Sequence, residues 1–231
     1  MPRDVGVVIV AAGQGTRIGG AVLKQFQPIA GVPMVLRALR PFITHPAVAQ
    51  VVLVLPAADA ASPPPFLTGL VGERLVLAAG GAARSESVAV GLGRLGAECT
   101  VVLVHDGARP FVERNVIDAV IAHARHGEAA TAAVPLADTL KEADAADPTR
   151  IGRTVPRDRL WRAQTPQGFP RSVLAEAHAR VGRDWRPATD DAELVERDGV
   201  TVRLVPDSTF NLKVTTPEDL ALAELLAGRA Q

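Results

Sequence analysis

A glycine-rich loop directly behind an apolar, β-branched run is the feature that most constrains this chain. Residues 5–12 read VGVVIVAA and residues 13–20 read GQGTRIGG. Eight apolar or small residues that end in a Gly-rich turn are typical of a buried parallel strand followed by a loop. Such a loop brings backbone N–H groups close to a phosphate, because glycine lacks a Cβ and permits positive φ.

This loop matches neither of two familiar phosphate-binding fingerprints. Gly13 and Gly15 would need a third glycine at position 18 to complete the dinucleotide motif, and Ile18 stands there. A P-loop needs Gly-Lys followed by Ser or Thr, but the first lysine, Lys24, follows a leucine. Two cations, Arg17 and Lys24, accompany the glycines instead. They predict a triphosphate-binding loop of a third kind, and the alternative is a structural turn with a surface Arg and Lys.

Length and composition restrict the class of protein. The 231 residues fit one domain, which buries roughly 70% of its unfolded surface without disulfides. Lys and Arg together number 25, as do Asp and Glu, so nothing indicates a nucleic-acid groove or an anionic membrane surface. Cys99 is the single cysteine, which fits a reducing compartment. No apolar run approaches the roughly 18 residues of a membrane span. We expect one cytoplasmic domain over residues 1–231, with no nucleic-acid or membrane partner.

Strands and helices alternate through residue 134. The predicted strands after the first lie at 50–55, 74–78, 100–104 and 129–134. The predicted helices follow residues 31–33 and lie around 88–95 and at 116–126, and the proline-rich stretch 59–65 is expected to be a surface loop. This alternation predicts an α/β fold with a mostly parallel sheet flanked by helices. Because ligands bind at the carboxyl ends of such strands, the loops 13–20, 80–87 and 105–110 should share one crevice.

The alternation breaks between residues 135 and 168. Short alternating segments at 138–142 and 153–157 flank a polar turn, which predicts a β-hairpin arm at about 136–160 that projects from the domain. Leu160 and Trp161 at its base need cover, which a partner subunit would supply. Beyond the arm we expect helices at about 171–181 and 190–198, a strand at 201–205 and a last helix from Pro217, capped by Thr216.

The loop at residues 80–87 reads GGAARSES. It is interpreted as a base-recognising turn in which Gly81 allows close backbone approach and Ser87 offers a hydroxyl. The alternative is a helix N-terminus with serine caps.

The loop at residues 105–110 reads HDGARP and follows a buried strand. Asp106 is a candidate for holding Mg²⁺ or a ribose hydroxyl, and Arg109 is a candidate for holding a phosphate. Alternatively, these two residues form an ion pair that stabilises the turn. His105 is interpreted as a packing or orienting histidine.

Other polar residues offer weaker signals. His123, His126 and His178 are expected on helix surfaces without a role, and Cys99 is expected in the core. Polar islands stand between predicted core elements at 165–167, 189–191 and 211–215. The last contains Lys213, one of three lysines in an arginine-rich chain.

Together these motifs resemble the family of 2-C-methyl-D-erythritol 4-phosphate cytidylyltransferases, from about residue 5 to residue 226. The motif AAGxGxR with Lys24 marks the wider group of sugar-nucleotide-type nucleotidyltransferases. The segments similar to the cytidylyltransferases in particular are VHDGARP at 104–110, WxxQTPQ at 161–167, TD at 189–190 and NxKVT at 211–215. The resemblance implies a Rossmann-like fold of the nucleotide-diphospho-sugar transferase type and a homodimer formed through the arm.

The resemblance also implies an activity of the isoprenoid pathway that does not use mevalonate. CMP would pass from CTP to 2-C-methyl-D-erythritol 4-phosphate, giving 4-diphosphocytidyl-2-C-methyl-D-erythritol and pyrophosphate. A divalent cation such as Mg²⁺ would be held mainly by the CTP phosphates, with Asp106 as the protein ligand. The implied catalytic residues are Arg17 and Lys24. The residues implied to bind CTP are Ala11, Ala12, Gly13, Gly15, Gly81, Ser87 and Asp106. Those implied to bind the sugar phosphate are Arg109, Thr139, Arg157, Thr165, Thr189 and Lys213.

One departure from the family pattern and two alternatives stay open. An acidic residue is usual just after the glycine pair, and this chain has Ala82, which leaves cytosine selectivity open. A cytidylyltransferase for another polyol phosphate, such as ribitol 5-phosphate, is the alternative within enzymes. A nucleotide-binding module without turnover is the alternative outside them, although Arg17 and Lys24 together argue for catalysis. A dehydrogenase is disfavoured by Ile18 and by Leu55, where an acidic strand end would be needed.

Overall fold

A seven-stranded sheet forms the centre of the molecule in the computed structural model, which describes residues 2–13, 22–181 and 188–229. Its strands in spatial order are β11 (Val202–Pro206), β7 (Ala129–Pro135), β10 (Trp161–Pro170), β6 (Val101–Asp106), β1 (Val5–Val10), β4 (Val48–Leu55) and β5 (Leu75–Ala79). Neighbouring strands run parallel except for β10, which is antiparallel to both β6 and β7. The predicted α/β fold with a mostly parallel sheet is confirmed.

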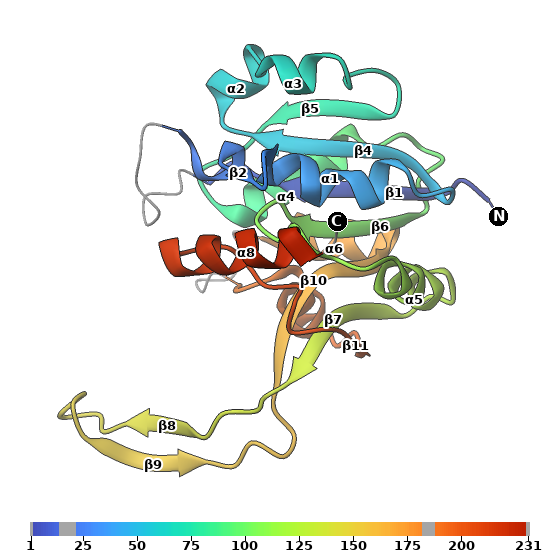
Figure 1. Ribbon diagram of the computed structural model, residues 1–231. Coiled ribbons are helices and arrows are strands. Elements are labelled where there is room, and N and C mark those ends of the chain that lie inside the picture. Colours follow the sequence, from blue (N-terminus) through green and yellow to red (C-terminus); the bar gives the residue numbers. More distant parts are fainter. Residues whose placement is uncertain (1, 14–21, 182–187, 230–231) are drawn as a thin grey trace.

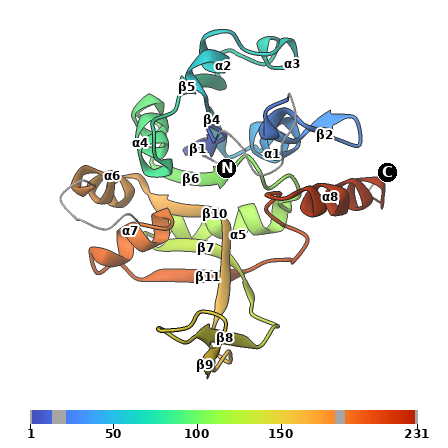
Figure 2. The same ribbon diagram turned by 90° about the vertical axis from the view of Figure 1, so that its left-hand side faces the viewer.

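Helices cover both faces of the sheet (Figure 2). One face carries α1 (Met34–Ile43) and α5 (Arg114–Arg125), and the other carries α4 (Arg84–Arg94), α6 (Arg171–Arg180) and α7 (Asp191–Arg197). The C-terminal α8 (Pro217–Arg229) lies beside the small hairpin of β2 (Pro28–Ile29) and β3 (Val32–Pro33). None of the helices among the described residues has the length and apolar character needed to cross a bilayer.

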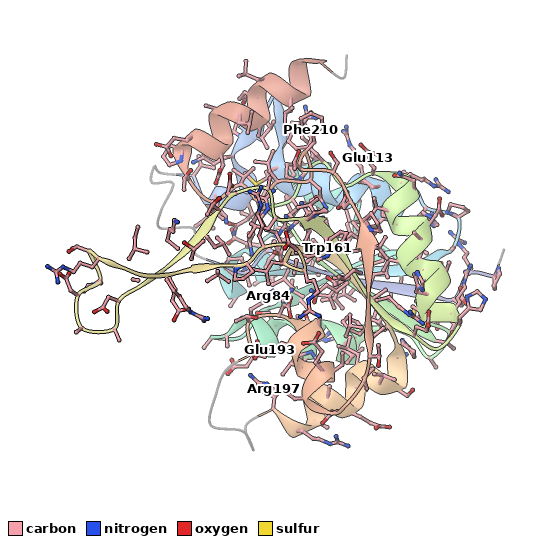
Figure 3. The ribbon with its side chains drawn as sticks, turned by 90° about the horizontal axis from the view of Figure 1, so that it is seen from below. Arg84, Glu113, Trp161, Glu193, Arg197 and Phe210 are labelled. Atoms are coloured by element: carbon pink, nitrogen blue, oxygen red, sulfur yellow. The ribbon has the colours of Figure 1, made fainter. Side chains whose placement is uncertain are left out.

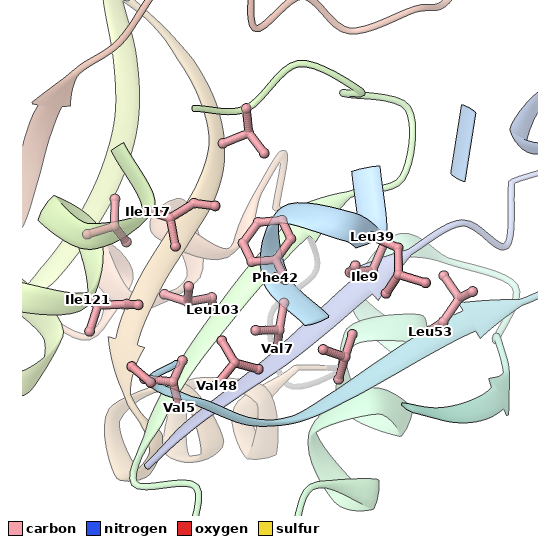
Figure 4. Packing of buried hydrophobic residues seen from close by; sticks show 14 of the residues in the cluster. Val5, Val7, Ile9, Leu39, Phe42, Val48, Leu53, Leu103, Ile117 and Ile121 are labelled. Atoms are coloured by element: carbon pink, nitrogen blue, oxygen red, sulfur yellow. The ribbon is translucent and has the colours of Figure 1, made fainter. Parts of the chain in front are cut away.

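The core explains why the first strand dominates the sequence. Val5, Val7 and Ile9 are fully buried and pack with Phe42 of α1 and Ile117 of α5 (Figure 4). Alternate residues of β1 face the opposite layer, where Val8 packs with α4 residues. A central strand buried on both faces needs a continuous apolar run, as the sequence has.

Two expectations about elements are wrong. The polar island at 165–167 lies inside β10, a strand that the sequence pattern did not predict. The stretch 59–65 is only partly a loop, because α2 (Ala57–Ala61) occupies its beginning and α3 (Pro65–Thr68) starts at its end. Alanines favour the first of these helices, and Pro65 is compatible with the first turn of the second.

A hairpin extends from the sheet between β7 and β10 (Figure 1). Its strands, β8 (Leu140–Ala143) and β9 (Ile151–Val155), pair antiparallel with each other and form a separate two-stranded sheet. The Leu136 N–H donates to the Leu160 carbonyl at 3.0 Å and closes the base. We call residues 136–160 the arm. Its strands expose Leu140 and Ile151, and Trp161 beside its base is 37% exposed.

Candidate active site

A cavity of about 210 Å³ opens at the carboxyl ends of β1, β5 and β6. The chain leaves β1 toward β4 on one side and returns to β6 on the other, so strand order reverses between β1 and β6. Ligands of doubly wound sheets bind at such a reversal. Residues after all three strands line the cavity, which confirms that the loops 80–87 and 105–110 share one crevice with Gly13; the rest of the expected segment 13–20 lies outside the described residues. Its lining residues include Ala11, Ala12, Gly13, Lys24, Gly81, Arg84, Ser87, Asp106 and Lys213.

Small residues let two of these loops approach each other. A Cβ on Gly80 would lie 2.4 Å from the Cβ of Ala12, so a larger residue would push the two loops apart. Ser87 Oγ donates to the Ala83 carbonyl at 3.1 Å. The Glu86 carboxylate accepts from the Ala82 N–H at 2.8 Å, so a carboxylate stands at this turn although residue 82 is alanine. Around Gly80 and Gly81, the wall of the cavity is therefore formed by backbone and short side chains.

Asp106 is the electrostatic centre of the cavity. Its carboxylate lies 2.7 Å from Lys213 Nζ, 3.3 Å from Arg84 Nε and 3.9 Å from Arg109 Nε. Burial alone would raise the pKa of Asp106, but the charges of Arg84 and Lys213 outweigh burial and hold this pKa well below its ordinary range. The cavity therefore combines one ionised carboxylate with several cations, an excess of positive charge that suits a polyanionic ligand.

His105 has a structural role behind the cavity and is not a candidate for acid–base catalysis. It is fully buried, its Nε2 donates to the Arg109 carbonyl at 3.0 Å, and its Nδ1 lies 3.0 Å from the Thr165 hydroxyl. The same hydroxyl accepts from the Asp106 N–H at 3.0 Å. Burial lowers the pKa of His105 to about 4, although its hydrogen bond to Arg109 opposes this. With both nitrogens engaged, His105 orients the turn, as the sequence indicated.

Arg84 is a lining residue that sequence reasoning missed. Its Nη1 donates to Asp191 Oδ2 at 2.6 Å, and Asp191 Oδ1 lies 3.0 Å from His178 Nε2. His178 is buried, so its predicted place on a helix surface is wrong: the side of α6 that carries it faces α7. The available signal was an arginine at the start of a helix behind two glycines.

The residues expected to bind the sugar phosphate fall into two groups: Arg109, Thr165 and Lys213 lie around Asp106, whereas Thr139, Arg157 and Thr189 do not line the cavity. Arg109 is buried and donates to the Asn211 carbonyl at 2.7 Å, and Thr165 is buried against Asp106. Thr189 donates its hydroxyl to Glu193 at the start of α7. Thr139 and Arg157 are exposed on the arm, where Arg157 donates to the Ala137 carbonyl. The residues expected to bind CTP, as far as the structure describes them, thus line one cavity, whereas Thr139 and Arg157 lie apart from it on the arm.

Two expected residues, Gly15 and Arg17, lie outside the described residues.

A divalent cation fits this site only with help from a ligand. Among the described residues, no three His, Cys, Asp or Glu side chains are grouped as a metal site. Asp106 is the single carboxylate among the described residues that line the cavity. Mg²⁺ characteristically takes one or two carboxylates and completes its shell with water and substrate phosphates. Asp106 suits that role for an ion carried by a triphosphate.

Comparison with known proteins decides the family. The family model described as 2-C-methyl-D-erythritol 4-phosphate cytidylyltransferase matches residues 5–229. The chain belongs to this family. A cytidylyltransferase of that name from Streptomyces coelicolor is 42% identical, over 99% of this chain and 86% of its own length. One from Bacillus velezensis is 40% identical, over 95% of this chain and 94% of its own. The crystal structure of the Thermus thermophilus cytidylyltransferase superposes with a TM-score of 0.80 at 37% identity, covering 97% of this chain and 99% of that one.

Membership of the cytidylyltransferase family confirms the resemblance read from the sequence motifs. It accounts for a glycine loop that is neither of the dinucleotide type nor of the P-loop type. It also accounts for the Rossmann-like sheet, since the structural neighbour shares it over nearly its full length.

Proposed function

We propose that this chain transfers CMP from CTP to 2-C-methyl-D-erythritol 4-phosphate, as the names of its relatives state for them. The observation that carries the proposal is the cavity at the strand-order reversal. It combines close backbone approach at Gly81 with a cluster of cations around Asp106. A small-walled pocket with that charge suits a nucleoside triphosphate.

In the proposed reaction, a phosphate oxygen of the sugar phosphate attacks the α-phosphorus of CTP. The new phosphorus–oxygen bond forms as the bond to the β-phosphate bridging oxygen breaks, and pyrophosphate leaves with that electron pair. The nucleophile is already an anion, so no general base is required. This agrees with His105, whose two nitrogens are committed to the wall.

The chain's contribution is position and charge. Lys24 lines the cavity, and we propose that it and Arg17 stabilise the charge that develops on the transferring phosphoryl group. Asp106 would hold a Mg²⁺ ion bound mainly to the CTP phosphates, and this ion would neutralise phosphate charge. Lys213, 2.7 Å from Asp106, stands where it can exchange that partner for a substrate phosphate.

We also propose a homodimer in which the arm of one chain completes the site of its partner. The support is that Thr139 and Arg157 are exposed on the arm and do not line the cavity, together with apolar side chains exposed on and beside the arm: Leu140, Ile151 and Trp161. A cytoplasmic location is proposed on the free, buried thiol of Cys99, which fits a reducing compartment.

The experiment that tests the activity is pyrophosphate release with CTP, Mg²⁺ and one polyol phosphate at a time. Release with 2-C-methyl-D-erythritol 4-phosphate is expected, with identification of the cytidylated product by mass. Faster release with ribitol 5-phosphate would assign the chain a different acceptor. No release with any acceptor, from a chain that binds CTP, would favour a binding module.

A further inference from the structure

The guanidinium of Arg84 is held between two carboxylates at the wall of the nucleotide cavity. Nε lies 3.3 Å from Asp106 Oδ1, and Nη1 lies 2.6 Å from Asp191 Oδ2. The Arg84 side chain is 28% exposed, whereas that of Asp191 is 1% exposed. A guanidinium has five N–H donors, so these two contacts leave donors for a bound nucleotide.

Asp191 is itself fixed by a second side chain, that of His178. Its second oxygen, Oδ1, lies 3.0 Å from Nε2 of His178, which reaches it from α6. Burial alone would raise the pKa of Asp191, but the His178 hydrogen bond and the Arg84 charge keep this pKa below its ordinary value. Asp191 therefore stays a carboxylate at neutral pH, with one oxygen on Arg84 and the other on His178.

The backbone that carries Asp191 is also fixed. Gln167 of β10 accepts from the N–H groups of Asp191 and Ala192, both at 3.1 Å, through its Oε1. Its Nε2 donates to Asp190 at 2.8 Å. A side chain fixed through its backbone and both oxygens is a preorganised anchor, which is what a precise binding geometry requires. Figure 3 shows Arg84 on the same side of the molecule as Glu193 and Arg197 of α7.

We infer that Asp191 and His178 form a positioning pair that fixes Arg84 for CTP binding. This inference rests on the proposed function for its ligand and extends it to two residues that do not line the cavity. Asp191 holds the arginine in register with Asp106, and His178 holds Asp191. Arg84 contacts the nucleotide, and the pair acts through Arg84 alone.

The test is a double-mutant cycle read by calorimetric titration with CTP and MgCl₂, so that no turnover is needed. Asp191→Asn should weaken CTP binding about tenfold or more, the scale of losing a charged hydrogen bond. Arg84→Ala should weaken it at least as much. If Asp191 acts through Arg84, the double variant should bind CTP no more weakly than Arg84→Ala. Additive losses would overturn the inference.

The chain offers a matched control on the same two helices. Asp198, at the end of α7, pairs with Arg180 of α6 at 2.5 Å, away from the cavity lining. Asp198→Asn removes an α6–α7 ion pair but leaves Arg84 untouched, so its CTP affinity should match the parent's. An equal loss of affinity in Asp198→Asn would show that helix packing, and not Arg84, is responsible, and would overturn the inference.

Variants of His178 keep the test decisive if Asp191→Asn fails to fold. His178→Leu removes the donor at similar size and should weaken CTP binding several-fold. His178→Gln retains a donor and should restore most of the affinity. Unchanged affinity in His178→Leu would overturn the role of the pair. A parent chain that binds no CTP would contradict the proposed function itself, whereas a CTP-binding parent with unaffected variants would contradict only this inference.

Discussion

At the scale of single residues, the charged side chains around the cavity are of two kinds: some are exposed to the cavity and can bind a ligand, and others are buried and stabilise its wall. Asp106 neutralises part of a cluster that would otherwise repel itself, since Arg84, Arg109 and Lys213 all point at it. Arg109 is buried in that wall, whereas Arg84 and Lys213 reach the cavity. Arginine thus has two roles here: the buried Arg109 stabilises the wall, and the partly exposed Arg84 is available to a ligand.

Lys24 gives the first prediction at this scale. Lys24→Ala should lower kcat about 10²-fold or more, because a preorganised charge near the transferring phosphoryl group acts mainly in the transition state. Lys24→Arg retains a charge and should recover part of the loss. Steady-state kinetics with both substrates varied provides the measurement. A near-normal kcat with only a raised KM for CTP would mean that Lys24 contributes to binding alone.

His105 gives a prediction about stability and pH. The pKa of His105 falls from its ordinary 6.5 to about 4 on folding, so the unfolded chain binds the proton more tightly. The contribution of His105 is therefore complete above pH 6.5 and is lost as the pH falls from 6.5 toward 4. That loss should amount to about 3 kcal/mol in the free energy of unfolding.

Urea unfolding at several pH values measures this loss. Acidic groups whose pKa values are lowered, such as Asp106 and Asp191, lose their stabilising contribution as the pH falls below about 5, so the His105 effect is separable between pH 6.5 and 5. His105→Gln should flatten the curve in that window. His126→Gln, at the solvent-exposed end of α5, is the control and should keep the parent's slope. A parent curve that is flat in this window would contradict the prediction.

At the scale of elements, the strands with apolar runs could be predicted from the sequence and β10 could not. β1, β4 and β6 are buried on both faces and consist mainly of Val, Ile and Leu, so each can be recognised from its own apolar run. In β10, the buried residues include three polar ones that hydrogen-bond to distant parts of the chain. Gln164 donates to the Asn211 carbonyl, Thr165 accepts from the Asp106 N–H, and Gln167 donates to the Thr131 hydroxyl. A strand stabilised by such partners leaves no hydrophobic pattern in its own sequence.

The site shows the same limit. Residues next to glycine loops were predicted because the loops mark strand ends, and the strand ends meet. Arg84, Asp191 and His178 were missed because they lie on three different helices, and their contact depends on how those helices pack. No spacing along the chain encodes it.

The arm gives the prediction at the element scale. Arg157→Ala should mainly raise KM for the sugar phosphate and leave KM for CTP near its parent value, because Arg157 is exposed on the arm rather than in the nucleotide cavity. Arg153→Ala is the matched control: Arg153 lies on β9 of the same arm and pairs with Glu142 at 2.6 Å. An effect of Arg157→Ala on CTP alone would reverse the division between the two sets of cations.

At the scale of the whole molecule, the question is which chain's arm serves which site. A proposed crossing arm means that each site combines the nucleotide cavity of one chain with Arg157 of its partner. In a dimer of one Lys24→Ala chain and one Arg157→Ala chain, one site then contains both defects and the other contains neither. An arm that serves its own chain would leave both sites defective.

Mixing these two variants should therefore restore activity at a sugar-phosphate concentration well below the KM of Arg157→Ala. With random exchange, half of the dimers are mixed and each has one intact site, so about a quarter of the parent activity should return. A second mixture tests the same crossing of the arm and should give the opposite result, a loss of activity in the mixed dimers. A chain carrying both substitutions, mixed with the parent, should form inactive dimers if the arm crosses, because each site receives one defect. Half-active mixed dimers in that experiment would show that the arm completes its own chain, and Arg157 would then have to reach the cavity by a movement of the arm within one subunit.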